Sequence, residues 1–436
     1  MVATVLASSF LRQRRSSSSS LSPPSSSPTF PTAVPPVKRE VHFVSIPISY
    51  QLPPSLHKSK MAKYLPPELI INILSMLPSK SLLRFRSVCK SWHSLISSPE
   101  FSPTHFHNFN KFNSRNLVRC CLWTEKREVY TVHHDDQHLT LDAPIDFPFN
   151  LLRDEYGTIF FTLIACCKGV VCLYNERSPK NEILLWNPSI RRKVTLTPPS
   201  YRPELTLVFG FGYCENSNDY KVVRLAYDRS NLIDRPEVEI YTVKTAVWKP
   251  IGFPQDSPCY HILSDCSQVF FNGSIHWLAT DLGVSHCSIL TMDMSTNLFG
   301  EIQLPEYLVN YSSMGVTLTV VGDSLGVIYS NRCTVVGSST YKIWVMKEYK
   351  KPTSWTLIYD VHYPDTDLGR PLKLRHNEDL VTESRRCNLS IYNREAGCYT
   401  VDGCCSKGVK LWSISIDKYE ECLTLLDVES AGNNEE

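Results

Sequence analysis

Apolar residues repeat at helical spacing in one short stretch near the start of the chain, residues 64–101. Pro66 and Pro67 suit the first turn of a helix, where a missing N–H leaves no bond unmade. The apolar positions that follow share one helix face and are Leu69, Ile70, Ile73, Leu74 and Leu77. Pro78 cannot continue this helix, so the pattern predicts a turn there.

Two further helices are predicted after that turn. Ser79 is placed to cap the second helix and Ser87 the third, and Ser97 to Pro99 end the third. The apolar positions of these two helices are Leu82, Leu83, Phe85, Val88, Trp92, Leu95 and Ile96. Domains this small bury little surface and usually need a partner or a neighbouring domain. An aromatic-rich linker follows, and we expect its rings to pack the helices against the next domain.

From Arg115 onward the pattern changes to short runs of Val, Ile, Leu, Tyr and Trp, separated by clusters of Gly, Pro, Asn or Asp. No stretch of ten residues repeats apolar positions at helical spacing. The pattern therefore predicts a long series of strands, with clear examples at 169–174, 182–186, 220–225, 238–243, 273–278, 289–294, 324–330, 343–346, 389–393 and 409–416.

The strands follow a loose repeat, in which an aromatic residue or Met ends one strand and a turn leads to the next. Six such anchors lie 48 to 56 residues apart, and they are Tyr130, Trp186, Tyr241, Met292, Trp344 and Tyr392. That spacing is near the length of a four-stranded propeller blade. We therefore predict a propeller-like domain of about six degenerate blades.

Composition and charge fit a large folded protein. The chain has 436 residues, of which 42% are hydrophobic, and its formal net charge is +2. Residues 1–60 carry seven of the Lys and Arg residues and one acidic residue, so the remainder is close to neutral. No field of one sign directs it to nucleic acid or to an anionic membrane, and we expect neither as a partner.

No pattern in the chain points to catalysis, a cofactor or a metal. The 16 cysteines form no regular framework, and adjacent pairs would point to opposite faces of a strand, so we expect reduced and mostly buried thiols. The Gly210–Gly212 run lacks the third glycine of a phosphate-binding loop, and no common hydrolase or zinc-protease motif occurs. We expect no enzyme activity in this chain.

The helical stretch closely resembles the F-box. The segments that carry the resemblance are Leu65-Pro66, Glu68-Leu69, Ile73-Leu74, Leu77-Pro78, Leu82-Leu83 and Arg86 to Trp92. The resemblance implies docking on the adaptor Skp1, and through it on cullin and RING subunits. By the family pattern, the Skp1-binding residues are Leu65, Pro66, Ile73, Leu74, Leu83, Val88, Cys89 and Trp92. A small DNA-binding module would also use basic helix residues, but it should show a wider basic surface.

The strand-rich region resembles the plant F-box-associated domain. The segments that carry this resemblance are 167–173, 185–189, 209–213, 219–223 and 272–278. Cys214 stands where that family usually has Asp, which puts the turn role of that carboxylate in doubt. The fold class implied is α+β and multidomain, with a small three-helix F-box followed by a mainly β, propeller-like domain.

These features lead to the hypothesis of a substrate receptor in a Skp1–cullin–F-box ubiquitin ligase, whose β domain binds an unknown protein. Loops expected to contact it are 175–181, 228–236 and 360–370. The alternative is a scaffold that binds Skp1 without promoting degradation. The family implies a location in cytoplasm or nucleus.

The expected domain boundaries follow from the changes in composition. They are a Ser- and Pro-rich extension at 1–60, the F-box at 61–106, a linker at 107–116, the β domain at 117–426 and a tail at 427–436. The extension is Arg-rich and poor in acidic residues, as organelle transit peptides are, or else is disordered and without structural role. Met61 would be a natural start just before the F-box.

Overall fold

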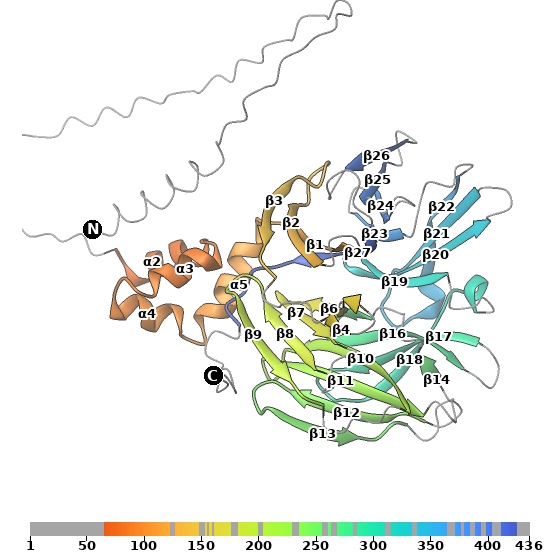
Figure 1. Cartoon of the computed structure of the whole chain (residues 1–436), viewed down its shortest axis with the longest axis horizontal. Coiled ribbons are helices and arrows are strands. Elements are labelled where there is room, and N and C mark those ends of the chain that lie inside the picture. The colour runs from red at the N-terminus through yellow and green to blue at the C-terminus, as the bar shows by residue number, and fades with distance from the viewer. Residues whose placement is uncertain are drawn as a thin grey trace, which may run out of the picture. The chain divides into compact units, whose positions relative to one another are not determined.

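Short helices precede a ring of β-sheets in the computed structural model (Figure 1). The structure describes residues 65–424, apart from 123–126, 148–152, 155–156, 159–160, 176–181, 199–203, 229–234, 255–259, 263–267, 282–285, 310–314, 334–337, 364–370, 376–378, 384–388, 394–397 and 403–410. The expected extension and tail lie outside these residues. The chain divides into two compact units, residues 1–72 and 73–436.

The F-box stretch and the expected linker form four α-helices, which are α2 (Pro67–Ser75), α3 (Ser79–Phe85), α4 (Lys90–Ile96) and α5 (Phe101–Lys111). Two predicted caps are wrong. Ser79 is the first residue of α3, whose N-cap is Pro78, and the Ser87 hydroxyl donates to the Arg84 carbonyl instead of capping α4. Pro78 and Cys89 are therefore the N-cap residues of α3 and α4, where serine caps were expected.

The fourth helix, α5, occupies the segment expected as an aromatic-rich linker. Its Phe101, His105 and Phe109 are buried, and their rings stack along one face with centroids 6.3 and 5.5 Å apart. The His105 ring lies 2.9 Å from the Leu77 carbonyl, and burial lowers its pKa. Phe106 packs against the hydrophobic cluster between the second and third blades, as expected for the linker aromatics.

Six antiparallel sheets form the blades in the described part of the chain, which confirms the predicted propeller. The first blade contains β27 (Leu411–Tyr419), β1 (Arg115–Leu122), β2 (Arg127–His134) and β3 (Leu141–Ile145). The second contains β6 (Thr162–Cys167), β7 (Val170–Tyr174), β8 (Ile183–Asn187) and β9 (Arg192–Leu196), and the short pair β4 (Arg153–Asp154) and β5 (Gly157–Thr158) precedes it. The third contains β10 (Leu205–Cys214), β11 (Asp219–Asp228), β12 (Glu237–Thr242) and β13 (Val247–Ile251).

The other three blades follow the same order. The fourth contains β14 (Tyr260–Ile262), β15 (Val269–Phe271), β16 (Ser274–Asp281), β17 (His286–Asp293) and β18 (Phe299–Gln303). The fifth contains β19 (Val316–Val321), β20 (Ser324–Cys333), β21 (Ser338–Met346) and β22 (Trp355–Tyr363). The sixth contains β23 (Pro371–Leu374), β24 (Leu380–Glu383), β25 (Leu389–Asn393) and β26 (Cys398–Asp402). Single turns of 3-10 helix are η1 (Glu306–Leu308) and η2 (Pro352–Ser354).

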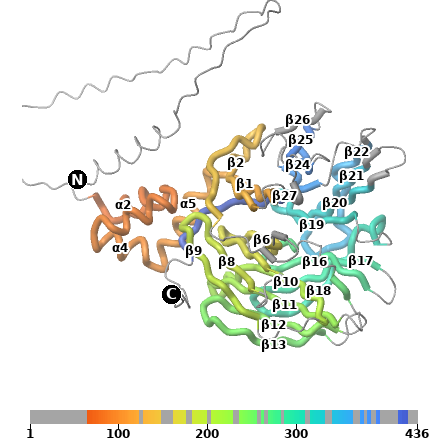
Figure 2. Tube along the Cα trace, viewed as in Figure 1, coloured from red at the N-terminus to blue at the C-terminus, as the bar shows by residue number. Residues whose placement is uncertain are grey.

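The ring is closed by the last strand of the chain. In Figure 2 the blue β27 lies beside the gold β1, and the two strands pair antiparallel with Arg115 opposite Tyr419. A hydrophobic cluster lies between each pair of neighbouring blades, including the sixth and the first. The pairing covers the edge of β1 that would otherwise be exposed.

The six sequence anchors occupy equivalent positions. Each lies on the third strand of its blade: β2, β8, β12, β17, β21 and β25. The turn after that strand contains a non-glycine residue with positive φ in the first five blades: Leu139, Arg191, Ala246, Asn297 and Lys350. The repeat read from the sequence is therefore the repeat of the fold.

Candidate functional site

The residues expected to bind a partner differ in exposure. Val88 is 50% exposed, and Leu65 and Ile73 are 37% and 38% exposed. Pro66 and Cys89 are also exposed. Large apolar side chains left in water are typical of interaction surfaces. These five residues are therefore candidates for direct contact with a partner.

The other three expected residues lie deeper. Leu83 is half-buried, whereas Leu74 is 1% and Trp92 6% exposed. The Trp92 ring packs on Phe85 with centroids 5.3 Å apart. Leu74 and Trp92 thus lie in the interior of the helices, where they can support a binding surface. Two further residues of the same stretch, Leu69 and Met76, are exposed but were not among those expected to bind a partner.

Val88 and Cys89 are presented by the turn between α3 and α4. Val88 lies between the two helices, and its N–H donates to the Phe85 carbonyl. The Cys89 Sγ lies 3.1 Å from the Ser91 Oγ, and hydrogen bonds from the Ser91 side chain and the Trp92 backbone lower the pKa of this thiol. The turn therefore offers one apolar and one polarisable group.

The strand ends that flank two of the expected contact loops lie at one rim of the propeller. The β6–β7 and β10–β11 turns lie side by side, because Lys168 pairs with Glu215 and the Tyr220 hydroxyl donates to the Lys168 carbonyl at 2.9 Å. The strands of each hairpin are antiparallel, so Tyr174 and Asp228 lie at the opposite rim. Most of the loops that begin there, and residues 364–370 of the third, lie outside the described residues.

The rim of the propeller that contains the β6–β7 and β10–β11 turns lies against α5. The Lys168 Nζ lies 4.1 Å from the centroid of the Tyr213 ring and 5.8 Å from that of Phe106 on α5. In the neighbouring turn, burial acts to raise the pKa of the Cys214 thiol, but hydrogen bonds with Ser217 outweigh it and the pKa is lowered. The thiol therefore takes a turn-stabilising role where the family usually has a carboxylate.

Metal-binding groups and membrane-spanning helices are two further features that could indicate a function. Among the residues that the structure describes, no three His, Cys, Asp or Glu side chains are grouped to hold a metal ion. No described helix is long and apolar enough to cross a membrane.

Comparisons with known proteins match both parts of the chain. A model of the F-box domain matches residues 64–104, and a model of the F-box associated beta propeller domain matches residues 91–411. An F-box/kelch-repeat protein of Arabidopsis thaliana is 28% identical over 78% of this chain and 92% of its own. The F-box protein CPR1 of Arabidopsis thaliana is 25% identical over 69% of this chain and 73% of its own.

Solved structures are matched more weakly. A prolyl endopeptidase matches with a TM-score of 0.36 and 12% identity, over 70% of this chain and 49% of that chain. A similarity this low carries no information about activity.

Proposed function

Because this chain belongs to the F-box proteins that carry an F-box associated beta propeller domain, we propose that it is the substrate receptor of a Skp1–cullin–F-box ubiquitin ligase. The observation that carries the proposal is an F-box followed in one chain by a closed six-bladed propeller. The F-box docks on a Skp1-like adaptor, which connects it to cullin and RING subunits, and the propeller holds a protein substrate. The receptor contributes proximity, since a bound substrate has a high effective concentration near the ubiquitin-loaded enzyme.

We assign residues of the F-box to the adaptor-binding surface by the exposure of their side chains. Leu65, Pro66, Ile73, Val88 and Cys89 contact the adaptor directly, because their side chains are exposed on the F-box. Leu83 lies at the margin, and the buried Leu74 and Trp92 hold the surface in shape. A partner that covers such apolar groups removes them from water, and that removal supplies most of the binding free energy.

Titration calorimetry with a purified Skp1-like adaptor tests this surface in the full chain. Val88→Asp should raise the Kd for the adaptor at least about tenfold, because burial of a valine contributes roughly 1.5–3 kcal/mol. The matched control is Phe112→Asp, which replaces a residue that is 69% exposed and outside the family pattern. It should leave the Kd unchanged. Wild-type protein that does not bind the adaptor at all would refute the proposed function.

A Skp1-binding scaffold remains the alternative, and it differs in one consequence. Under proteasome inhibition a receptor accumulates ubiquitinated partners that co-purify with the full chain and disappear in the Val88→Asp variant. A scaffold co-purifies unmodified partners in both inhibited and untreated cells. Because the adaptor works in cytosol and nucleus, we place the protein there, which imaging of a tagged full chain tests.

A further inference from the structure

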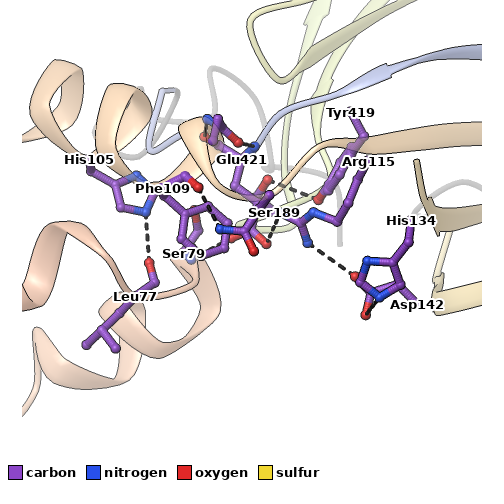
Figure 3. Close-up of polar contacts among 12 residues, drawn as sticks. Leu77, Ser79, His105, Phe109, Arg115, His134, Asp142, Ser189, Tyr419 and Glu421 are labelled. Carbon is purple, nitrogen blue, oxygen red and sulfur yellow. Dashed lines mark hydrogen bonds and ion pairs between the residues drawn. The ribbon is translucent and has the colours of Figure 1, made fainter. Parts of the chain in front are cut away.

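One glutamate near the end of the described chain contacts three separate parts of the molecule. Glu421 is buried and lies in a segment that begins at the last residue of β27, here called the strap (residues 419–424). Its Oε2 accepts a hydrogen bond from the backbone N–H of Ser79 at 2.6 Å, and its Oε1 pairs with the Arg115 Nη2 at 3.0 Å (Figure 3). Ser79 begins α3, and Arg115 begins β1.

The backbone of Glu421 also forms hydrogen bonds, in addition to the contacts of its side chain. The Asn110 amide donates to the Glu421 carbonyl at 2.9 Å, and its Oδ1 accepts from the Glu421 N–H at 2.9 Å. Asn110 lies on α5, so the strap holds the last helix as well as the beginning of α3. All four of these contacts join residues more than 300 positions apart in the sequence.

The strap is in turn fixed to the propeller. The Asn187 amide donates to the carbonyls of Cys422 at 3.1 Å and Thr424 at 2.8 Å. The Tyr419 hydroxyl lies 3.2 Å from the Ser189 Oγ. Both partners belong to the end of β8 and the turn after it, in the second blade. The strap thus joins the helices to two neighbouring blades at once.

The contact between Glu421 and Arg115 joins two opposite charges that are buried. The Arg115 side chain is 9% and that of Glu421 10% exposed, so loss of Arg115 would leave the Glu421 carboxylate buried without its counter-charge, whereas Arg115 also pairs with Asp142 at 3.3 Å. The Arg115 guanidinium also lies over the rings of Phe109 and Tyr419, with centroids 5.3 and 5.1 Å away. A displaced α5 would lose the Phe109 contact together with the hydrogen bonds of the strap.

We propose that Glu421 is a positioning residue, which fixes helices α3 and α5 at one orientation on the propeller. This proposal rests on the proposed function for its biological role, since a fixed orientation sets where a propeller-bound substrate meets the ubiquitin-loaded enzyme. The orientation itself is a property of the isolated chain and can be measured without any ligase subunit.

Distance measurement by double electron–electron resonance tests the orientation in the adaptor-free full chain. The 16 cysteines exclude thiol labelling, so ketone-reactive spin labels are attached at Ser94→p-acetylphenylalanine on α4 and Lys249→p-acetylphenylalanine on β13, both exposed. Wild type should give one narrow distance distribution, and Glu421→Ala a broad one. Glu421→Gln keeps an acceptor for the Ser79 N–H but loses the charge, so its distribution should be intermediate.

Two further variants keep the test decisive. Asn110→Ala removes the pair of hydrogen bonds to the strap without touching a buried charge, and should broaden the distribution even where Glu421→Ala reduces folding. Glu348→Ala removes an exposed ion pair with Lys351 on the fifth blade and should leave the distribution narrow. Equally narrow distributions in wild type, Glu421→Ala and Asn110→Ala would overturn the proposal.

Adaptor binding separates this proposal from the proposed function. The Kd for the adaptor should stay within about threefold of wild type in Asn110→Ala, because the exposed residues of the F-box are unchanged. In a reconstituted ligase, the set of lysines modified on the receptor itself should become broader. A narrow wild-type distribution that broadens in Glu421→Ala and Asn110→Ala, in a chain that never binds the adaptor, would uphold the positioning role and refute the receptor function.

Discussion

The buried carboxylate of Glu128 should be one of the most costly side chains to remove from the propeller. It is fully buried and accepts hydrogen bonds from the Arg119 Nε at 3.0 Å and Nη2 at 2.9 Å. It also accepts from the Tyr130 hydroxyl at 2.8 Å and from the Phe161 N–H at 2.7 Å. Arg119 donates in addition to the Phe161 carbonyl, so the network joins the first blade to the segment that enters the second.

The expected cost follows from what Glu128→Ala leaves behind. The Arg119 side chain is 7% exposed, and its charge would remain in the interior without a counter-charge. Loss of one partner of a buried ion pair costs about 3–5 kcal/mol. The Arg119→Met, Glu128→Leu double variant removes both charges and should be at least about 1 kcal/mol more stable than the single variant, because no bare charge remains buried.

Urea unfolding followed by tryptophan fluorescence at pH 7 measures these differences. The matched control is Glu348→Ala, whose ion pair with Lys351 is 65% and 55% exposed at the two side chains and should contribute at most about 1 kcal/mol. The reasoning fails if Glu128→Ala unfolds at the same urea concentration as the control, or if the double variant is less stable than Glu128→Ala.

Three further changes test the packing between blades. Burial lowers the pKa of His276 to about 4, so the unfolded chain binds more protons between pH 4 and about 6.5, and stability should fall by up to about 3 kcal/mol as the pH drops through that window. Urea titrations should show this loss in wild type and not in H276Q. Gly210→Ala would press a methyl group against the buried Trp277 and should cost about 1–3 kcal/mol, measured as a lower unfolding midpoint. Trp355→Phe removes a 2.9 Å hydrogen bond to the Gln303 carbonyl of the preceding blade and should cost about 1 kcal/mol in the same assay.

The propeller was predictable because each blade repeats a local requirement. The anchor position on the third strand is buried in all six blades, so a large side chain such as Trp186 or Tyr241 occurs there at nearly constant spacing. The sequence also pairs Trp344 with Trp355 across a turn, and the structure shows why: Trp355 bonds the preceding blade while Trp344 fills the cluster between the two. A repeat of this kind reflects contacts between neighbouring strands and blades. These contacts recur at a nearly constant spacing along the sequence.

The helix ends and the strap were not predictable in the same way. Ser79 was expected to cap α3 with its own hydroxyl, but the acceptor for its N–H is Glu421, which is 342 positions away. Nothing near either residue signals that contact. Similarly, Phe109 and His105 were recognised as packing aromatics, yet their helical arrangement depends on burial against other helices and the propeller. The exposure that separates Val88 from Trp92 is also a tertiary property.

The strap also has a consequence for the order in which the protein is made. Asn110 and Glu421 are 311 residues apart, so the F-box leaves the ribosome long before its strap is synthesised. At about 5–20 residues per second that interval is on the order of 15–60 s. During this time the helices lack the contacts that fix them and the first blade lacks its inner strand, β27. The F-box helices therefore acquire these contacts only after translation has reached the strap.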